Sequence, residues 1–299
     1  MIQDQATMLR ELVRPSVSDA EKPPSPHRLS LALTIASGKG GVGKTNVTVN
    51  LAAALAKMGL KTVVFDADLG TANADVLCGL DPRYTLESVL RGTHEVQDVM
   101  VTGPGGFELI PGASGCSDLA SLSPERRQEV LGQLAALESQ ADILLIDVAA
   151  GIGEDVMGFA AAADALMVVA TPEPTSITDA YAFIKMARRY APDRTPDLLL
   201  NLADDEEEAR EVHLRMDRAC RQFLNFGLPL AGVVPRDEAV RRAVRSRLPF
   251  VISEPNSAAT RAINQLASRL GGRPACDSHE KGGFLGRLVQ WISVRRAKG

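Results

Sequence analysis

The stretch Gly38-Lys39-Gly40-Gly41-Val42-Gly43-Lys44-Thr45 decides the fold class, because it matches the pattern G-x-x-x-x-G-K-[ST] of a phosphate-binding loop. A strand-like segment at 29–35 precedes the loop, and a helical pattern at 46–58 follows it. Glycines let backbone N–H groups turn inward around phosphates, and the start of the helix adds partial positive charge. We expect Lys44 to reach the β- and γ-phosphates of a nucleotide and Thr45 to place its hydroxyl on Mg²⁺.

Acidic residues follow two other apolar runs. Asp66 and Asp68 come after Thr62–Phe65, and Asp147 ends the run Ile143–Ile146. Acids just past the carboxyl end of a parallel strand face the ligand crevice of an open sheet. We expect Asp147 to bind Mg²⁺ through water, because such an acid about a hundred residues after the loop is typical of this site. One of Asp66 and Asp68 can support Mg²⁺ and the other can orient the attacking water, unless one is only a helix cap or turn residue.

Short apolar runs alternate with helical patterns along the middle of the chain. Further strand-like runs lie at 166–169, 198–200 and 230–234, and helical patterns lie at 124–140, 175–190, 205–224 and 236–247. This alternation predicts an α/β fold with a mostly parallel twisted sheet flanked by helices. Apolar residues make up 45% of the chain and aromatic residues 4%, which suits a buried sheet with an aliphatic core.

Composition divides the 299 residues into three parts. A flexible N-terminal segment with a Pro- and Ser-rich linker occupies 1–28, the α/β domain occupies 29–270, and a second linker with an amphipathic segment occupies 271–299. The net charge of −4 makes the whole chain a poor general ligand for nucleic acid. The four cysteines have no metal-type spacing. Because no segment resembles a secretion signal or a spanning helix, we expect a cytoplasmic location.

The loop carries a second lysine, Lys39, that an ordinary phosphate-binding loop does not need. The sequence KGGVGKT resembles the deviant Walker A motif of the MinD/ParA family of P-loop ATPases. The resemblance implies a MinD-like P-loop NTPase fold, ATP and Mg²⁺ as cofactors, and a homodimer in which Lys39 contacts the partner's nucleotide. It assigns catalytic roles to Lys39, Lys44 and Asp68, the last as the water-orienting residue. Metal binding falls to Thr45 and Asp147, with Asp66 supporting the ion.

Three stretches narrow the resemblance to the FlhG (FleN) group of flagellar-number regulators within that family. They are ASGKGGVGKTN at 36–46, DADLGTANADVLCGL at 66–80 and TPEPTSITDAYAFIK at 171–185. The resemblance implies that the loop Gly38–Asn46 holds the nucleotide and that adenine lies against Asn201, Pro235 and Asp237. Asn201 could instead cap the helix that begins near 204. The sequence departs from the group at 147–151, where DVAAG stands in place of DTGAG, and this leaves the rate of hydrolysis open.

The C-terminal segment has an apolar face at helical spacing. The face consists of Phe284, Leu285, Leu288, Trp291 and Ile292, and arginines lie around it. An amphipathic helix of this kind lies in a membrane interface with tryptophan at headgroup depth, and it resembles the membrane-targeting tail of the MinD family. We expect reversible binding to anionic lipid at the inner face of the cell membrane, with a polar position left open. The alternative is a helix packed on the protein's own surface, and the two states can alternate with the nucleotide.

Residues 4–10 (DQATMLR) match the DQAxxLR activator motif of the FlhG group. The resemblance implies that Asp4, Gln5, Leu9 and Arg10 bind an FlhF-type GTPase and that the segment stimulates it. Flagellar switch (C-ring) proteins and a FleQ-type transcription regulator are further partners that the group suggests.

Two other interpretations stay open. A ParA-like partition ATPase would bind DNA, and the only dense basic cluster is Arg241, Arg242, Arg245 and Arg247. Acids beside that cluster favour a solvated helix face, so direct DNA binding is not expected. An adaptor that binds ATP with little turnover is the other interpretation, because the 147–151 stretch is altered. Salt-dependent DNA binding and phosphate release separate these alternatives.

Overall fold

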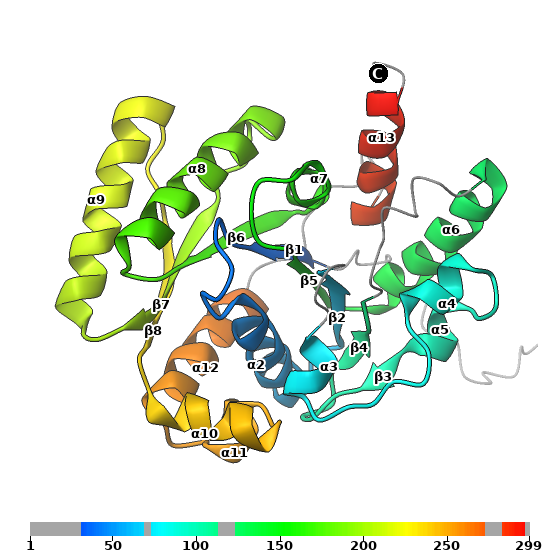
Figure 1. Ribbon diagram of the computed structural model, residues 1–299, viewed down its shortest axis with the longest axis horizontal. Coiled ribbons are helices and arrows are strands. Elements are labelled where there is room, and N and C mark those ends of the chain that lie inside the picture. Colours follow the sequence, from blue (N-terminus) through cyan, green and yellow to red (C-terminus); the bar gives the residue numbers. More distant parts are fainter. Residues whose placement is uncertain (1–30, 69–72, 113–122, 273–282, 297–299) are drawn as a thin grey trace, which may run out of the picture.

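The computed structural model describes residues 31–68, 73–112, 123–272 and 283–296. Eight strands in these ranges form one sheet in the order β3-β4-β2-β5-β1-β6-β7-β8. Every neighbouring pair is parallel except β3 with β4. The predicted α/β fold, with a mostly parallel sheet flanked by helices, is therefore confirmed (Figure 1).

The strands are β1 (Leu31–Ala36), β2 (Thr62–Ala67), β3 (Val101–Thr102), β4 (Glu108–Ile110), β5 (Ile143–Val148), β6 (Ala165–Ala170), β7 (Asp197–Ala203) and β8 (Leu230–Pro235). The helices are α2 (Lys44–Lys57), α3 (Ala74–Leu77), α4 (Leu86–Leu90), α5 (Val96–Val99), α6 (Pro124–Gln140), α7 (Glu154–Ala162), α8 (Pro174–Tyr190), α9 (Glu206–Leu224), α10 (Glu238–Ser246), α11 (Phe250–Ser253), α12 (Ala258–Gly271) and α13 (Phe284–Arg296).

Helices cover both faces of the sheet (Figure 1). On one face, α2, α11 and α12 contribute Leu51, Val251 and Ile263 to a core cluster with the sheet. On the other face, residues of α6, α7, α8, α9 and α13 form the second cluster, in which Phe159 and Phe284 are members. No helix in the described ranges is long and apolar enough to cross a bilayer.

Strand order places the functional loops at one edge of the sheet. β1 pairs with both β5 and β6, and β2 pairs with β5 in a register that sets Asp66 opposite Asp147. Since these strands are parallel, their carboxyl ends share one edge. The loops that follow β1, β2 and β5 therefore meet there.

Eight elements had no counterpart among the predicted ones, namely α3, α4, α5, α7, α11, α12, β3 and β4, and two cases show why a sequence pattern can miss an element. α7 is the first, because six of its nine residues are buried, so its sequence lacks the polar face that marks an amphipathic helix. The β3–β4 edge is the second, because strands of two and three residues are too short to show a period. The predicted helices at 124–140, 175–190 and 205–224 correspond to α6, α8 and α9.

Candidate functional site

The phosphate-binding loop joins β1 to α2 and borders a pocket of about 610 Å³. Gly41 and Gly43 have φ values of 80° and 84°, a left-handed conformation that glycine adopts without strain from a Cβ. The pocket is lined by Ser37, Gly40, Gly41, Val42, Gly43, Lys44, Thr45, Asn46, Asp68, Asn73, Val76, Leu77, Ala149, Ala150 and Val244. The predicted loop residues from Gly40 to Asn46 thus share one cavity with Asp68.

Gly38 serves a different purpose from the other loop glycines. A Cβ at this position would lie 2.1 Å from the carbonyl oxygen of Asp179 in α8. The loop therefore approaches the backbone of α8 so closely that only glycine fits. Gly38 and Lys39 are not among the residues that line the pocket.

Lys44 and Asp147 form a buried ion pair at the floor of the site. Lys44 Nζ lies 2.5 Å from Asp147 Oδ1, and the two side chains are 7% and 0% exposed. Thr48 donates to the same oxygen at 3.3 Å. The other oxygen, Oδ2, is buried and has no hydrogen-bond partner among the described residues.

This carboxylate fits the predicted Mg²⁺ site. A buried charged oxygen without a partner is costly unless an ion or water satisfies it, and oxygen ligands are those that Mg²⁺ prefers. Asp147 and Thr45 would hold the metal, which would supply charge neutralisation between phosphates. Lys44 is placed to exchange its pairing with Asp147 for a phosphate.

Asp66 organises the start of the loop that follows β2. Its carboxylate accepts hydrogen bonds from the backbone N–H groups of Asp68 at 3.1 Å, Asn73 at 3.2 Å and Ala74 at 3.2 Å. Burial, and next the charge of Asp147, raise the pKa of Asp66 from 3.8 to about 7. These bonds position Asp68 and Asn73, both of which line the pocket.

Lys39 is held within its own chain. Its Nζ lies 3.1 Å from Glu173 Oε2 and donates to Thr175 Oγ1 at 2.9 Å, at the start of α8. An exposed ion pair of this kind contributes about 0–1 kcal/mol. The lysine can therefore leave Glu173 for another anion at small cost.

The three residues predicted to contact adenine do not line the pocket. Asn201 donates to the carbonyl oxygen of Val42 at 2.8 Å, and it does not cap α9, whose N-cap is Asp205. The next residue, Leu202, has a φ of 61° at a break in the strand register, which is the kind of bulge that redirects a side chain near a functional site.

Asp237 and Pro235 lie at the start of α10. Asp237 caps that helix by accepting from the Ala239 N–H at 2.9 Å, and it also accepts from the Ala259 N–H at 3.2 Å. Burial alone would raise the pKa of Asp237, but its backbone hydrogen bonds lower the pKa below its ordinary value. Pro235 ends β8. Asp237 therefore holds the loop between β8 and α10 in place.

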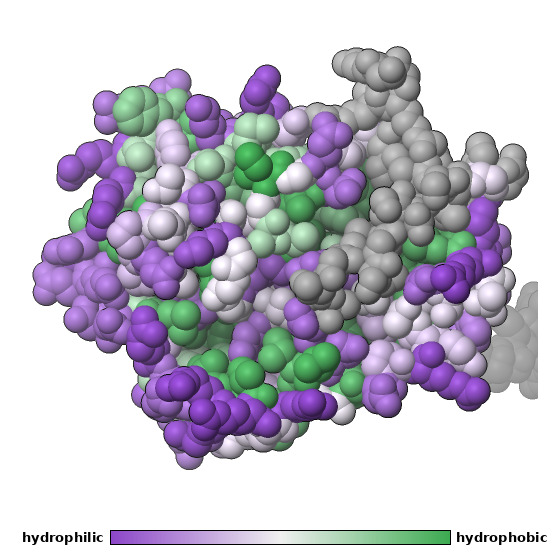
Figure 2. All heavy atoms as spheres, viewed as in Figure 1, coloured by the Kyte–Doolittle hydropathy of each residue, from purple (hydrophilic) through white to green (hydrophobic). Residues whose placement is uncertain are grey.

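Two exposed apolar side chains line the pocket. Val76 on α3 is 47% exposed and Val244 on α10 is 40% exposed, and both line the pocket. Figure 2 shows apolar surface gathered over and between α3 and α10 on this face. Ile152, in the loop between β5 and α7, is 50% exposed. Exposed apolar groups beside a polar site are typical of a surface that another protein covers.

The C-terminal helix packs on the domain. Phe284, Leu285 and Leu288 are buried at 0%, 4% and 4% exposure, and the rings of Phe284 and Phe159 stack with centroids 6.3 Å apart. The Trp291 ring packs so tightly on α7 that a Cβ at Gly158 would lie 2.8 Å from it. Four of the five predicted membrane residues are thus placed against the protein, and the side chain of Ile292 lies outside the described part.

Polar contacts fix the first turn of α13 on the domain. Glu138 of α6 accepts from the N–H groups of Phe284 at 2.6 Å and Leu285 at 3.2 Å. Arg287 Nη2 lies 2.5 Å from Asp164 Oδ1, and both side chains are largely buried. The predicted partner-binding residues Asp4, Gln5, Leu9 and Arg10 lie outside the residues that the structure describes.

Comparison with known proteins agrees with this geometry. The model of the CobQ/CobB/MinD/ParA nucleotide binding domain matches residues 33–250. The antiactivator FleN of Pseudomonas aeruginosa is 40% identical over 86% of this chain and 93% of its own. The flagellum site-determining protein YlxH of Helicobacter pylori is 33% identical over 80% of this chain and 81% of its own.

Among solved structures, the septum site-determining protein MinD of Pyrococcus horikoshii, complexed with Mg-ADP, superposes with a TM-score of 0.66. It is 27% identical and covers 81% of this chain and 96% of its own. The Mg-ADP of that relative agrees with a nucleotide pocket lined by the phosphate-binding loop and Thr45. This chain therefore belongs to the MinD/ParA family of nucleotide-binding proteins, within its FlhG/FleN group.

Proposed function

We propose that this protein is a Mg²⁺-dependent ATPase switch that dimerises with ATP, binds the cytoplasmic face of the cell membrane and regulates flagellar number or placement. The observation that carries the proposal is the pairing of two features. The pocket lined by the phosphate-binding loop also touches the loop that leads into α7, and an amphipathic helix docks along the same α7. Binding or hydrolysis of ATP in the pocket can therefore control the docking of α13 on α7.

Hydrolysis would use residues that the site already brings together. Lys44 would neutralise the phosphates, Asp147 and Thr45 would hold Mg²⁺ with Asp66 behind them, and Asp68 would orient the attacking water. Phosphate release by the full chain with Mg-ATP tests this. Lys44→Ala should lose nucleotide, whereas Asp68→Ala should retain nucleotide and lose turnover.

Dimerisation would place Lys39 on the partner's nucleotide. Its exposed pairing with Glu173 and Thr175 leaves it free to move, and the apolar rim formed by Val76, Val244 and Ile152 would be covered by the second subunit. Adenine would lie between Asn201 and the loop containing Pro235 and Asp237, after Asn201 exchanges its bond to Val42. ATP-dependent change in molecular mass tests the dimer.

Membrane binding would follow release of α13. The loop between β5 and α7 touches the pocket through Ala149 and Ala150, and the Gly151 N–H donates to the Ser37 carbonyl oxygen at 2.9 Å. A change in this loop when ATP binds would shift α7, and with it the surface on which α13 sits. Co-sedimentation with anionic vesicles, in ATP and in ADP, tests the link.

The N-terminal segment would act on an FlhF-type GTPase. The match of DQATMLR at 4–10 to the activator motif supports this role, and a glutamine can orient an attacking water beside a γ-phosphate. A synthetic peptide of residues 1–20 should accelerate GTP turnover, and Gln5→Ala should reduce the acceleration. Flagellar switch proteins and a FleQ-type regulator are further partners, which pulldowns with ATP and ADP would test.

An ATP-binding adaptor with little turnover is the second candidate. Val148 and Ala149 replace the threonine and the first glycine of the usual DTGAG stretch, and this loss of a hydroxyl and a glycine favours slow hydrolysis. A DNA-binding role has less support, because Arg241 pairs with Glu238 at 3.0 Å and Arg242 with Glu254 at 2.9 Å. Single-turnover phosphate release distinguishes the adaptor from the ATPase.

A further inference from the structure

We infer that Asn50, which lies outside the phosphate-binding loop, orients the amide of Asn46 so that its NH₂ group donates to the phosphates of the bound nucleotide. The inference rests on the proposed function, namely nucleotide binding in the pocket. Asn46 lines the pocket near the start of α2. Asn50 lies one turn further along and is 1% exposed, so it acts on the nucleotide only through Asn46.

The orientation of Asn50 follows from a backbone donor. The Val251 N–H lies 3.0 Å from the Asn50 oxygen Oδ1, and a backbone N–H can only donate. The oxygen of Asn50 must therefore face Val251, and its NH₂ group must face the opposite way. That NH₂ group donates to Asn46 twice, to the carbonyl oxygen at 2.8 Å and to Oδ1 at 2.8 Å.

The orientation of Asn46 follows in turn. Its side-chain oxygen accepts from Asn50, so its NH₂ group points away from Asn50. Among the described residues nothing accepts a hydrogen bond from that group. The first turn of a helix leaves backbone N–H groups free to bind anions, and an added NH₂ donor suits phosphate. A flipped amide would instead present an oxygen to the phosphates.

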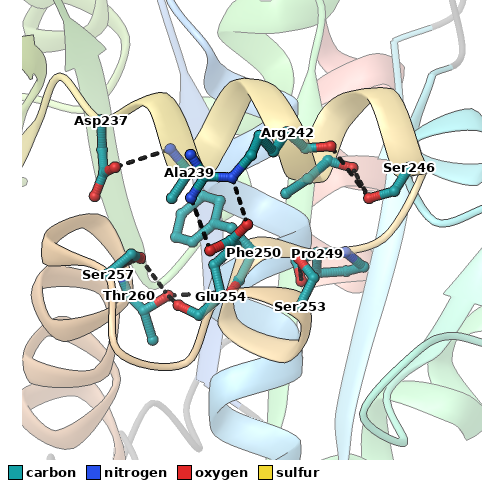
Figure 3. Close-up of polar contacts among 11 residues, drawn as sticks. Asp237, Ala239, Arg242, Ser246, Pro249, Phe250, Ser253, Glu254, Ser257 and Thr260 are labelled. Carbon is teal, nitrogen blue, oxygen red and sulfur yellow. Dashed lines mark hydrogen bonds and ion pairs between the residues drawn. The ribbon is translucent and has the colours of Figure 1, made fainter.

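Side-chain hydrogen bonds tie α11, which carries the Val251 N–H, to α10 and α12. Val251 is in the first turn of α11, where a helix leaves N–H groups without partners, and Asn50 supplies one. Arg242 binds Glu254 through two hydrogen bonds of 2.9 Å. Thr260 donates to the carbonyl oxygens of Phe250 at 3.1 Å and Glu254 at 2.8 Å (Figure 3). These bonds hold α11 in place, so the Val251 N–H sets the orientation of Asn50. Asn50 in turn sets the orientation of Asn46.

A double-mutant cycle on the full chain tests the inference, with Mg-ADP as a ligand that is not turned over. In Asn50→Asp the carboxylate still accepts from Val251 but offers a second acceptor to Asn46, whose amide should flip. We expect about tenfold weaker Mg-ADP binding by the folded variant, equivalent to about 1.4 kcal/mol, with the melting temperature of the nucleotide-free protein recorded to show that it is folded. In Asn46→Ser the hydroxyl is one bond shorter and rotates freely, so it can donate to phosphate whatever residue 50 is. Adding Asn50→Asp to Asn46→Ser should therefore change affinity less than about twofold.

Equal tenfold losses in both backgrounds would overturn the inference, because the charge introduced by Asn50→Asp would then act directly on the nucleotide. Failure of the wild-type chain to bind Mg-ADP would instead overturn the proposed function. If Asn50→Asp does not fold, Asn50→Ala takes its place in the cycle, because it removes the donor that orients Asn46 and should again cost affinity with Asn46 present but not with Asn46→Ser. The two single variants at position 46 then test the contact with phosphate. Asn46→Asp should lose binding and Asn46→Ser should keep it, and wild-type affinity in Asn46→Asp would show that this side chain does not face the phosphates.

Discussion

Asp66 and Asp147 are neighbouring carboxylates on β2 and β5, 1% and 0% exposed. Lys44 compensates Asp147 directly, whereas the hydrogen bonds to Asp66 come from backbone donors. Burial and the adjacent charge therefore keep the pKa of Asp66 near 7 in the protein without nucleotide or metal. A cation at the site would reverse this balance, since it favours the ionised form of both acids.

The first prediction concerns this pKa. Between 3.8 and about 7, the folded protein keeps a proton on Asp66 that the unfolded chain has released. The contribution of Asp66 to the free energy of unfolding is therefore fully present below the unfolded-state pKa of 3.8. It is lost as the pH rises through the folded-state pKa of about 7. The side chain in Asp66→Asn cannot titrate. The melting temperature of the variant minus that of the wild type should therefore increase as the pH rises from about 5 to about 8. The measurement is thermal unfolding without nucleotide and Mg²⁺.

The exposed carboxylate Asp81 provides the control for this prediction. Asp81→Asn removes the same charge from the surface, and it should follow the wild type at every pH. Parallel curves for wild type and Asp66→Asn would contradict the prediction.

Local motifs made most of the phosphate site predictable. Lys44, Thr45 and Asp147 could be assigned because each lies at a fixed place in a loop or at a strand end. Two contacts could not be predicted, because each joins residues that lie far apart in the sequence. They are the hydrogen bond from Asn201 to Val42 and the ion pair between Lys39 and Glu173. Asn50 was missed because a buried polar residue inside a helix has no sequence signal that distinguishes it from a core position.

At the scale of elements, α7 joins the nucleotide pocket to the docked helix. It begins after Gly153, beside the loop that lines the pocket, and it carries Gly158 and Phe159 against α13. The amphipathic pattern of 284–296 could not show this docking from sequence, because an apolar face suits a membrane and a protein groove equally. The geometry shows the docked state and gives contacts that can be broken one at a time.

The second prediction is that Gly158→Ala weakens docking of α13 without touching the pocket. The new Cβ would lie 2.8 Å from the Trp291 ring, and overpacking of this kind costs about 1–3 kcal/mol. Trp291 is the only tryptophan of the chain, so its fluorescence reports docking directly. We expect red-shifted emission and faster proteolysis after residue 283 in the variant, with unchanged Mg-ADP affinity.

Gly132→Ala and Gly286→Ala are matched controls for that substitution. A Cβ at either position meets nothing within 4 Å, and alanine favours a helix over glycine by about 1 kcal/mol. Both controls should keep the wild-type emission. An unshifted spectrum in Gly158→Ala would mean that α7 tolerates the methyl group and does not control the docking of α13.

At the scale of the whole molecule, the third prediction concerns assembly. Asp68→Ala should hold an ATP-bound dimer, because it removes the residue proposed to orient water and leaves the phosphate loop intact. Lys39→Ala should bind ATP and stay monomeric, because it loses the proposed contact with the partner's nucleotide, while the exposed pairing with Glu173 and Thr175 contributes little to stability. Light scattering with Mg-ATP measures both. Lys61 is an exposed lysine before β2, at the opposite end of that strand from Asp66. Lys61→Ala is therefore the control and should behave as the wild type. If Asp68→Ala stays monomeric with ATP at every concentration, the proposed ATP-bound dimer is contradicted.

The fourth prediction joins assembly to the membrane. α13 buries Phe284, Leu285 and Leu288 in the monomer, so release exposes apolar surface that a bilayer can cover, at about 0.8 kcal/mol for each buried CH₂. Ordering and lost freedom offset much of this gain, so one helix should bind weakly, whereas two helices on a dimer should bind far more tightly through raised effective concentration.

Asp68→Ala with ATP should therefore sediment with anionic vesicles, and the same protein with ADP should stay in solution with Trp291 in its docked environment. Trp291→Glu should abolish sedimentation while keeping the ATP dimer, which separates the membrane step from assembly. Equal sedimentation of the ATP and ADP forms would mean that the nucleotide does not control α13.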